Sequence, residues 1–301
     1  MQKEKRQQGR EFSRRDFVKA AAMASFAGAS ANLTGKLYAA GSDVLKVGLV
    51  GCGGRGTGAT TQALMGVDKS VRLWAMADLF KDKLETTYDM LSNGAKGRYD
   101  RVDFDGLADQ MDVPEQRRFT GFDAYQKLID SGVDMVILAT PPHFRPEHFE
   151  AAVKAGKHVF MEKPVAVDPA GIRRVIAAAQ LAKQKGLSVA AGTQRRHQLH
   201  YVEIMKRIHD GAIGEIVAAQ CYWNGGGGSL RGDKPDGMSD MEWQVRHWYY
   251  FCWLCGDHIV EQHVHNIDVM NWALGSHPLQ CMGIGGREVR KGGNIWDHFA
   301  V

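Results

Sequence analysis

A glycine-rich turn directly after an apolar run is the feature that most constrains this chain. Residues 45–50 have strand character, and Gly51, Gly53 and Gly56 follow in the G-x-G-x-x-G spacing. The first glycine permits a tight turn, the second lets the backbone approach a pyrophosphate, and the third lets the next helix pack closely. N–H groups at the start of that helix would face a phosphate. The turn therefore predicts a dinucleotide site that includes Gly54 and Arg55, if strand and helix flank it.

Strand and helix patterns alternate after this turn, as the motif requires. The alternation predicts a parallel sheet with helices on both faces, which is an α/β fold of the Rossmann-type, doubly wound class. We assign residues 43–167 to this domain and expect residues 187–193 to complete its sheet. Strands are expected over residues 71–77, 134–139, 158–161 and 187–191, with helices over 57–65, 79–91, 122–129, 145–155 and 168–185. The polar residues 92–118 are expected to form an insertion with at most one short helix.

Polar residues fall where these expected strands end, and ligands on such sheets bind at the carboxyl ends of the strands. Asp78 ends the second strand and would hold a ribose 2′-hydroxyl, although it could equally cap the following helix. Its charge would repel a 2′-phosphate, which favours NAD over NADP, while Arg55 could contact a phosphate and weakens that preference. Later strands end at Thr140 and at Glu162-Lys163.

The glycine turn, Ala139-Thr140-Pro141-Pro142-His143 and Glu162-Lys163-Pro164 together resemble the glucose–fructose oxidoreductase and inositol dehydrogenase family (Gfo/Idh/MocA), over roughly residues 44–275. The resemblance implies a second α/β domain with an open mixed sheet, on which a sugar lies against the nicotinamide. It also implies that Lys163 lies in the active site and that the turn at residues 192–196 borders cofactor and substrate. The cofactor-binding residues it implies include Thr140, Pro141, His143, Glu162, Lys163 and Gln194.

A cluster of acidic and imidazole side chains is the candidate catalytic element of the second domain. In a helix expected over residues 258–273, Glu261, His265 and Asp268 share one face. The family pattern has Asp, His and Asp here, so Glu261 is longer by one methylene. We expect His265 to exchange the hydroxyl proton, Lys163 to polarise and position the same oxygen, and Glu261 either to support them or to contact a sugar hydroxyl. A buried, hydrogen-bonded histidine is the alternative for His265.

Other candidates for substrate binding are Arg195, Arg196, Trp243 and Asp268. Solvated surface charge is the alternative for the two arginines, core packing is the alternative for Trp243, and a structural ion pair is the alternative for Asp268. No metal is expected, because neither HExxH nor a paired CxxC is present. The single Cys252-Trp253-Leu254-Cys255 motif is interpreted as buried core cysteines.

The second half, residues 168–301, is expected to form the substrate and oligomerisation domain, with a strand over residues 215–223. The sequence stops at Val301 within an expected strand, whereas family members continue with further strands. We therefore expect a fragment of a longer homo-oligomeric protein, with a bare sheet edge, an exposed apolar face and low stability.

The first 40 residues have the pattern of a twin-arginine signal peptide. Ser13-Arg14-Arg15-Asp16-Phe17-Val18-Lys19 precedes a mildly apolar stretch over residues 20–33, which is too short for a membrane span. A basic amphipathic helix on a cytosolic protein is the alternative. The chain carries a net charge of +4, but residues 1–40 carry +5 and the remainder −1, so a nucleic-acid partner is not expected.

These patterns predict an exported, periplasmic or extracytoplasmic NAD-dependent oxidoreductase that acts on a sugar, glycoside or polyol. A glycosidase that holds NAD tightly and oxidises its sugar transiently is the alternative enzyme. A binding protein that kept the fold and lost turnover is the alternative of a different class.

Overall fold

The described part of the chain comprises residues 44–66, 69–93, 106–225 and 228–301 of a computed structural model. The signal peptide expected over residues 1–40 lies outside these ranges. Residues 94–105 of the insertion expected over residues 92–118 also lie outside them. The described part of that insertion holds two short 3-10 helices, Ala108–Gln110 and Glu115–Arg117, rather than one. No helix in the described ranges is long and apolar enough to cross a bilayer.

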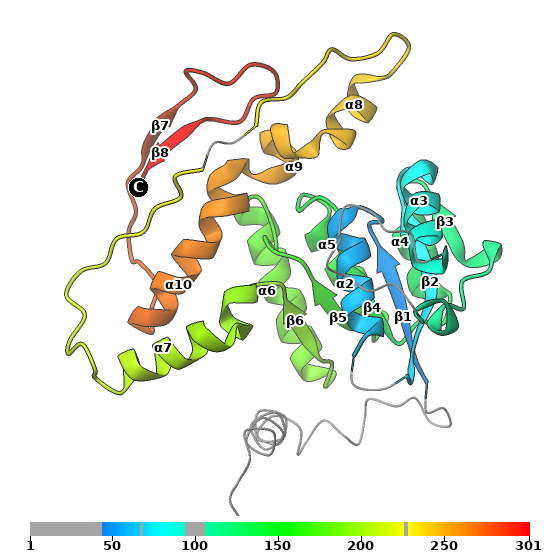
Figure 1. The fold of residues 1–301 in the computed structure, drawn as a ribbon, viewed down its shortest axis with the longest axis horizontal. Coiled ribbons are helices and arrows are strands. Elements are labelled where there is room, and N and C mark those ends of the chain that lie inside the picture. The colour runs from blue at the N-terminus through cyan, green and yellow to red at the C-terminus, as the bar shows by residue number, and fades with distance from the viewer. Residues whose placement is uncertain (1–43, 67–68, 94–105, 226–227) are drawn as a thin grey trace, which may run out of the picture. The chain divides into compact units, whose positions relative to one another are not determined.

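The first half is built on a six-stranded sheet with the strand order β3-β2-β1-β4-β5-β6 (Figure 1). The pairs β1–β4, β2–β3, β4–β5 and β5–β6 are parallel. Strand order reverses between β1 and β4, and ligands on doubly wound sheets bind beside this switch point. The predicted Rossmann-type α/β class is confirmed. The strands are β1 Leu45–Val50, β2 Val71–Asp78, β3 Arg118–Thr120, β4 Met135–Leu138, β5 His158–Met161 and β6 Val189–Ala191.

Five α-helices connect these strands and flank the sheet (Figure 1). They are α2 Gly54–Leu64, α3 Lys81–Asn93, α4 Ala124–Asp130, α5 Arg145–Lys154 and α6 Pro169–Gln184. Helix α6 shows why the boundaries fall where they do. The Asp168 carboxylate accepts the Gly171 N–H at 2.6 Å, and Pro169 occupies the first turn, where no N–H partner is needed.

The core of the first half lies between this sheet and its helices. Phe149 on α5 is fully buried in a cluster with Leu138 of β4 and Val159 of β5. Burial of each such side chain stabilises the fold by about 1.5–3 kcal/mol relative to exposure. This packing fixes α5 and the carboxyl ends of β4 and β5, and these elements carry the candidate site.

Strand β3 was not predicted; it begins at Arg118, the last residue of the stretch interpreted as an insertion. It is three residues long and not fully buried, and it pairs with Met76–Asp78 of β2 at the sheet edge. A three-residue strand with a polar composition has too little hydrophobic periodicity to be identified from sequence.

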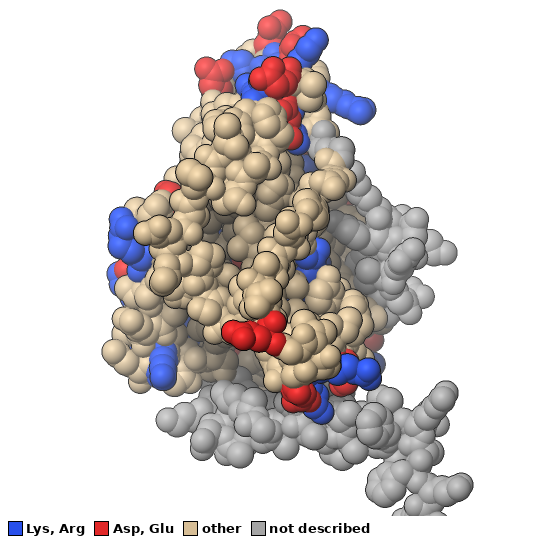
Figure 2. Space-filling view, turned by 90° about the vertical axis from the view of Figure 1, so that its left-hand side faces the viewer, with Lys and Arg blue, Asp and Glu red and all other residues tan. Residues whose placement is uncertain are grey.

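Because α6 and β6 belong to the first sheet and its flanking helices, the second half is from here on the chain after β6. In the described residues, its regular structure is mainly helical. Its elements are α7 Leu199–His209, α8 Asp240–Arg246, α9 Cys252–Cys255, the π-helix η5 Ile259–His263, α10 Val264–Leu274, β7 Ile284–Gly286 and β8 His298–Ala300. Strands β7 and β8 form an antiparallel pair. In the described residues, this pair is all that is seen of the mixed sheet expected for the second half. Figure 2 views the side formed by these elements, and charged side chains are sparse over its middle.

The strand predicted over residues 215–223 is wrong. These residues form neither helix nor strand, and most of their side chains are exposed. A strand needs a neighbour to pair its N–H and C=O groups, and in the described structure no strand pairs with this segment.

Candidate active site

The glycine turn has the geometry that a dinucleotide requires. Gly51 has φ +99°, and a Cβ built there would lie 2.6 Å from the backbone of Ala139 and Thr140. A Cβ on Gly56 would lie 1.9 Å from the Gly51 carbonyl oxygen, so only glycine allows α2 to start this close to β1. Gly53 caps α2 without a side chain and has open space around its Cα. The N–H groups at the start of α2 are therefore accessible to a phosphate.

Asp78 at the end of β2 ties this turn to the next strand. Its carboxylate accepts the N–H of Cys52 at 2.7 Å and the N–H of Phe80 at 2.8 Å. Burial raises the pKa of this carboxyl, while the two N–H groups oppose the shift. The side chain thus organises the backbone on both sides, and it also lines the pocket that the turn borders.

A pocket of about 820 Å³ lies along the carboxyl ends of β1, β2 and β4. Its volume is in the range of about 300–1,000 Å³ that small-molecule and cofactor sites occupy. Its walls include a large share of the predicted cofactor residues, together with three residues of the second half, Val245, Arg246 and Trp248. The predicted residues that line it are Gly51, Gly53, Gly54, Asp78, Thr140 and Pro141.

The other predicted cofactor residues lie around this pocket. Arg55 forms an ion pair with Glu162 at 3.0 Å. Glu162 also packs against Gly192, and a Cβ on Gly192 would lie 2.7 Å from the Glu162 carboxylate. His143 is exposed and packs edge-on against Trp253. Gln194 is exposed in the short helix η3 Gln194–His197.

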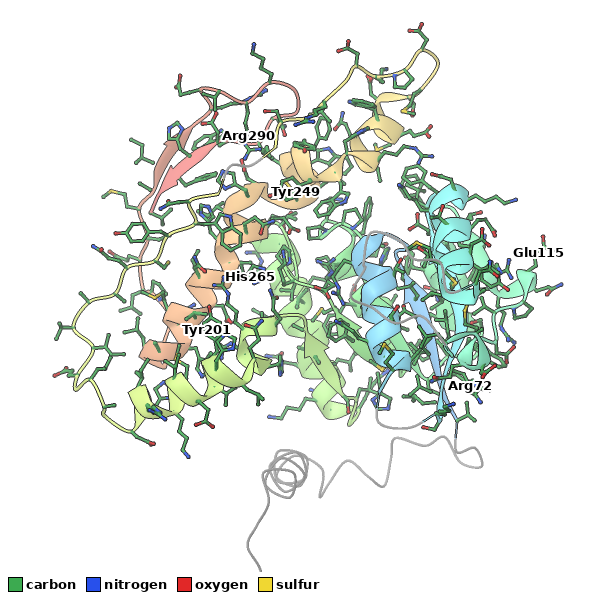
Figure 3. All side chains as sticks on the ribbon, viewed as in Figure 1. Arg72, Glu115, Tyr201, Tyr249, His265 and Arg290 are labelled. Carbon is green, nitrogen blue, oxygen red and sulfur yellow. The ribbon has the colours of Figure 1, made fainter. Side chains whose placement is uncertain are left out.

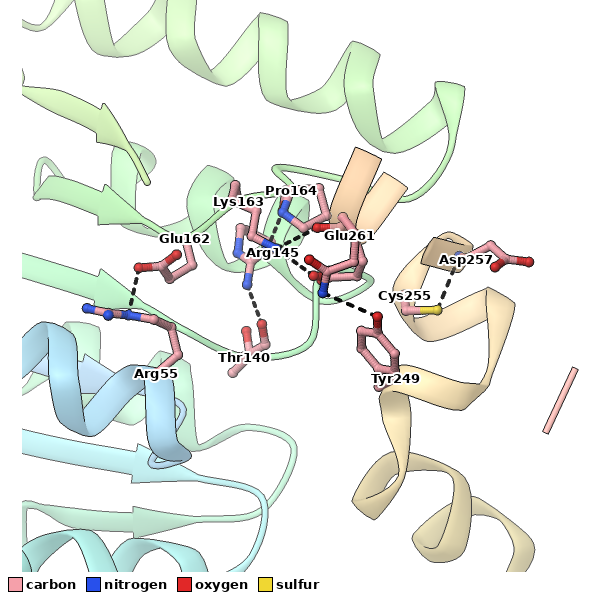
Figure 4. A network of polar contacts seen from close by, with 11 residues as sticks. Arg55, Thr140, Arg145, Glu162, Lys163, Pro164, Tyr249, Cys255, Asp257 and Glu261 are labelled. Atoms are coloured by element: carbon pink, nitrogen blue, oxygen red, sulfur yellow. Dashed lines mark hydrogen bonds and ion pairs between the residues drawn. The ribbon is translucent and has the colours of Figure 1, made fainter. Parts of the chain in front are cut away.

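Lys163 and Glu261 meet although they are 98 positions apart in the sequence (Figure 4). The Lys163 Nζ donates to the Glu261 carboxylate at 2.7 Å and to the Glu261 carbonyl oxygen at 2.6 Å. Glu261 is buried, and this burial raises its pKa, although the cations of Lys163 and Arg145 oppose the shift. The ion pair places the end of β5 against the second half of the chain.

Arg145 is a charged residue of this cluster that was not predicted. Its guanidinium is buried and donates to the carbonyl oxygens of Thr140 and Pro164, so it joins the loops after β4 and β5 (Figure 4). Burial lowers its pKa to about 10, and the nearby carboxylates of Glu261 and Glu162 oppose the shift. An arginine at the first turn of a helix reads as a surface residue in sequence, so only the fold reveals this role.

His265 on α10 is buried, and Figure 3 shows it on the side of α10 that faces the first half. Its pKa is lowered to about 4, first by burial and then by the cations of Lys163 and Arg195. The imidazole is therefore neutral near pH 7 and can accept a proton. The ring of Trp223 stacks on it with centroids 6.0 Å apart, a contact that was not predicted.

The three remaining polar candidates bind one another or a neighbour. Arg196 and Asp268 form a bidentate ion pair with nitrogen–oxygen distances of 2.8–3.0 Å. Arg195 donates to the neutral side chain of Asn266. Trp243 packs on His247 in the region of α8, with ring centroids 3.9 Å apart. The pairing of Asp268 with Arg196 is the structural ion pair that was the alternative for Asp268. Arg195 has an uncharged partner, Asn266.

The helix expected over residues 258–273 begins with a π turn. Within η5, the Nδ1 atom of His258 lies 3.1 Å from the Nε2 atom of His263, and these residues are five positions apart. Five-residue spacing brings side chains together in a π turn, and such turns are frequent at functional sites. Glu261 lies inside this turn, so the histidine pair holds the segment that presents Glu261 to Lys163.

Metal and disulfide chemistry find no site in the described residues. No group of three or more His, Cys, Asp or Glu side chains is placed there to hold an ion. All five cysteines are free. Burial raises the pKa of Cys252 to about 11 and that of Cys255 to about 12, so both thiols are protonated and unreactive near neutral pH.

Comparisons with known proteins agree with this geometry. Residues 45–192 match the model of the "Oxidoreductase family, NAD-binding Rossmann fold". The chain is 39% identical over 92 residues to Inositol 2-dehydrogenase 1 of Saccharopolyspora erythraea, which covers 31% of this chain and 27% of that protein. It is 26% identical over 163 residues to scyllo-inositol 2-dehydrogenase (NAD(+)) of Bacillus subtilis, covering 54% and 42%.

Solved structures share the fold. The aldose-aldose oxidoreductase of Caulobacter crescentus gives a TM-score of 0.58 at 22% identity, covering 85% of this chain and 66% of that one. The scyllo-inositol dehydrogenase of Lactobacillus casei with bound NAD(H) and scyllo-inositol gives 0.55 at 21% identity, covering 82% and 61%. The matches span less than half the length of the two curated relatives. Residues 45–192, just under half of the chain, therefore match the NAD-binding Rossmann domain of the Gfo/Idh/MocA oxidoreductase family.

Proposed function

We propose that the protein is an NAD-dependent oxidoreductase that acts on a hydroxyl group of a sugar, glycoside or polyol. The observation that carries the proposal is the meeting of Lys163 and Glu261, within electrostatic reach of His265. The relatives named as inositol dehydrogenases support a cyclic polyol or sugar as the substrate class. When bound, the nicotinamide supplies the hydride acceptor.

The residues of the chain divide the remaining work. The lowered pKa keeps His265 neutral near pH 7, so a ring nitrogen is free to accept the proton of the substrate hydroxyl. Lys163 donates a hydrogen bond to the same oxygen and stabilises the negative charge that develops there. Glu261 holds the Lys163 ammonium in place through its carboxylate and its carbonyl oxygen. Of the predicted substrate contacts, Arg195 is retained, and Trp223 is added beside His265. Arg196 and Asp268 are assigned a positioning role, because they pair with each other, and Trp243 is not assigned to the substrate, because it belongs to α8.

The test is NADH formation from a panel of inositols, aldoses and polyols, with NAD and NADP compared as cofactors. We expect turnover with NAD on at least one cyclic polyol or sugar. We expect Lys163→Met to lower kcat by about 10³-fold or more, because the developing alkoxide loses its cation. Lys127→Met, which removes an exposed lysine of α4 (Ala124–Asp130), is the matched control. Wild-type kcat in Lys163→Met would reject the assignment, and NAD binding without turnover on the whole panel would favour a binding protein.

A glycosidase with retained NAD is the second candidate, and the cover that α8 forms over the cofactor pocket favours it. In such an enzyme the hydride returns to the sugar, so a glycoside is cleaved without net NADH. Release of phenol from aryl glycosides without added NAD would identify this activity. Stoichiometric NADH with no cleavage would identify the dehydrogenase instead.

Export and self-association complete the proposal. Residues 1–40 are proposed to act as a twin-arginine leader, which a reporter fusion tests, since replacement of Arg14 and Arg15 by lysine would abolish export. Exposed apolar side chains in the second half, such as Val217, Leu279 and Met282, support a homo-oligomer. Sedimentation velocity of the purified protein measures this directly, and a monomer at all concentrations would contradict it.

A further inference from the structure

One wall of the cofactor pocket comes from a distant part of the chain. The glycine turn, the end of β2 and the start of α3 form the wall nearest the expected adenosine ribose, and Val245, Arg246 and Trp248 line the same cavity. These three residues belong to α8 and the turn that follows it, more than 150 positions after α3. Arg246 of α8 meets Asp82 at the start of α3. The pocket is therefore closed partly by the second half of the molecule.

Arg246 fastens this helix to the first half through its guanidinium. Its two terminal nitrogens lie 3.0 and 3.1 Å from the carboxylate oxygens of Asp82, in the first turn of α3. Its Cζ atom also lies 3.9 Å from the centre of the Phe80 ring. A bidentate guanidinium–carboxylate pair has a fixed geometry, and stacking on an aromatic face adds to it.

The rest of α8 is preformed for this contact. Ser239 caps the helix by accepting the Glu242 N–H at 3.1 Å, and Glu242 accepts a hydrogen bond from the Arg246 Nε at 2.9 Å. Val245 is 5% exposed, so the helix is packed against the molecule rather than free in solvent. Arg246 is therefore oriented before it meets Asp82, which lowers the entropic cost of the pair.

We propose that α8 is a clasp over the adenosine side of the cofactor pocket and that the Arg246–Asp82 pair is its latch. A dinucleotide that rests on the glycine turn and Asp78 lies beneath α8, and it leaves only after Arg246 separates from Asp82. The latch therefore slows cofactor release and keeps the cofactor on the protein between turnovers. This inference rests on the proposed NAD function and adds cofactor retention to it.

The experiment measures the rate at which bound NADH leaves the purified protein, by stopped-flow fluorescence with excess NAD as competitor. We expect Arg246→Gln to raise the dissociation rate by about tenfold, because it removes both the ion pair and the cation–π contact, and Asp82→Asn to raise it by about threefold, because it removes the ion pair alone. The double variant should be no faster than Arg246→Gln, because Asp82 has no latch to form once Arg246 is replaced. The reversed pair Asp82→Arg with Arg246→Asp should return the rate to within about threefold of wild type.

A matched control removes a comparable pair outside this pocket. Arg174→Gln breaks the Arg174–Glu150 ion pair between α6 and α5 and should leave the dissociation rate unchanged. Wild-type rates in Arg246→Gln and Asp82→Asn, or additive effects in the double variant, would overturn the clasp while leaving the proposed function intact. A wild-type protein that binds no NADH would overturn the proposed function itself, and the clasp with it.

Discussion

The two halves of this molecule are packed very differently. Among the described residues, thirty of the thirty-five buried hydrophobic residues lie from Val47 to Ala182, and the other five lie from Met205 to Ile295. Of the twenty large hydrophobic side chains that are exposed, sixteen lie from Leu199 onward. The first half is a close-packed sheet with helices, whereas the second is a set of helices and extended segments with a two-stranded sheet.

This difference shows how the candidate site is assembled. The packed half fixes the glycine turn, Asp78 and Lys163 at strand ends, where backbone hydrogen bonds hold them. The second half contributes Glu261 and His265, and it is fastened to the first by the ion pairs Lys163–Glu261 and Arg246–Asp82. The packed half thus carries the proposed cofactor site, and the more exposed half adds the residues proposed for proton transfer and for holding Lys163.

The largest expected effect tests whether the second half supplies the base. We expect His265→Asn to lower kcat by about 10²–10⁴-fold, the usual contribution of a positioned general base. NADH binding should be unchanged, since the cofactor contacts come from the first half and α8. His277→Asn, which alters an exposed histidine after α10, is the control. A kcat within twofold of wild type in His265→Asn would mean that the first half carries the chemistry alone.

Hydrogen exchange tests the packing contrast itself. Amides of β1, β4 and β5 should exchange at least about a hundredfold more slowly than amides of residues 211–225 and 276–283, because buried ladders open only with the core. Mass spectrometry of peptic fragments resolves these segments. Equal protection in both halves would show that the second half is as cooperative as the first.

The π turn gives a smaller, local test of how the second half aims Glu261. We expect His263→Ala to lower kcat by about tenfold, since without the His258–His263 hydrogen bond the turn relaxes and Glu261 loses its alignment with Lys163. His263→Gln, which can still hydrogen-bond His258, should recover part of the loss. An unchanged kcat and pH profile in His263→Ala would leave the histidine pair with a purely structural role.

The pKa of His265 also links the two halves, because burial lowers it first and the Lys163 ammonium of the first half lowers it further. The imidazole should titrate near 4 in an NMR titration, well below its ordinary value of 6.5. Its proton-accepting form is lost as the pH falls through this value, so kcat/KM should fall there too. Replacing Lys163 by Met removes a positive charge and should raise the pKa of His265 by about one unit. A pKa near 6.5 in the wild type would show that His265 is solvated.

Part of this arrangement could be predicted from sequence. The glycine turn, Asp78 and Lys163 were predictable because a local spacing or a strand end encodes them, and strand ends meet at one edge of a parallel sheet. The resemblance placed Lys163 in the active site and gave Glu261 the position of a shorter acid, but the ion pair between them was not predicted. Apart from β3, the strands of the first sheet were predicted to within about two residues, because buried parallel strands form continuous apolar runs.

The remainder depends on contacts between distant residues. Arg145 is buried only because the loops after β4 and β5 converge on it. A π-helix has hydrogen bonds one residue longer than those of an α-helix, and the five residues Ile259–His263 are too few for the sequence pattern to distinguish the two. Arg246 reads as a surface arginine until the fold brings it to Asp82, and Trp223 was assigned to a strand that does not form.

The most direct measurement is a crystal structure of the protein with NAD and a polyol or sugar bound. The account predicts the pyrophosphate over Gly51–Gly56, the adenosine beneath α8, and the nicotinamide facing one substrate hydroxyl that contacts both Lys163 and His265. A dinucleotide bound elsewhere, or Lys163 and His265 too far apart to reach the same oxygen, would contradict it.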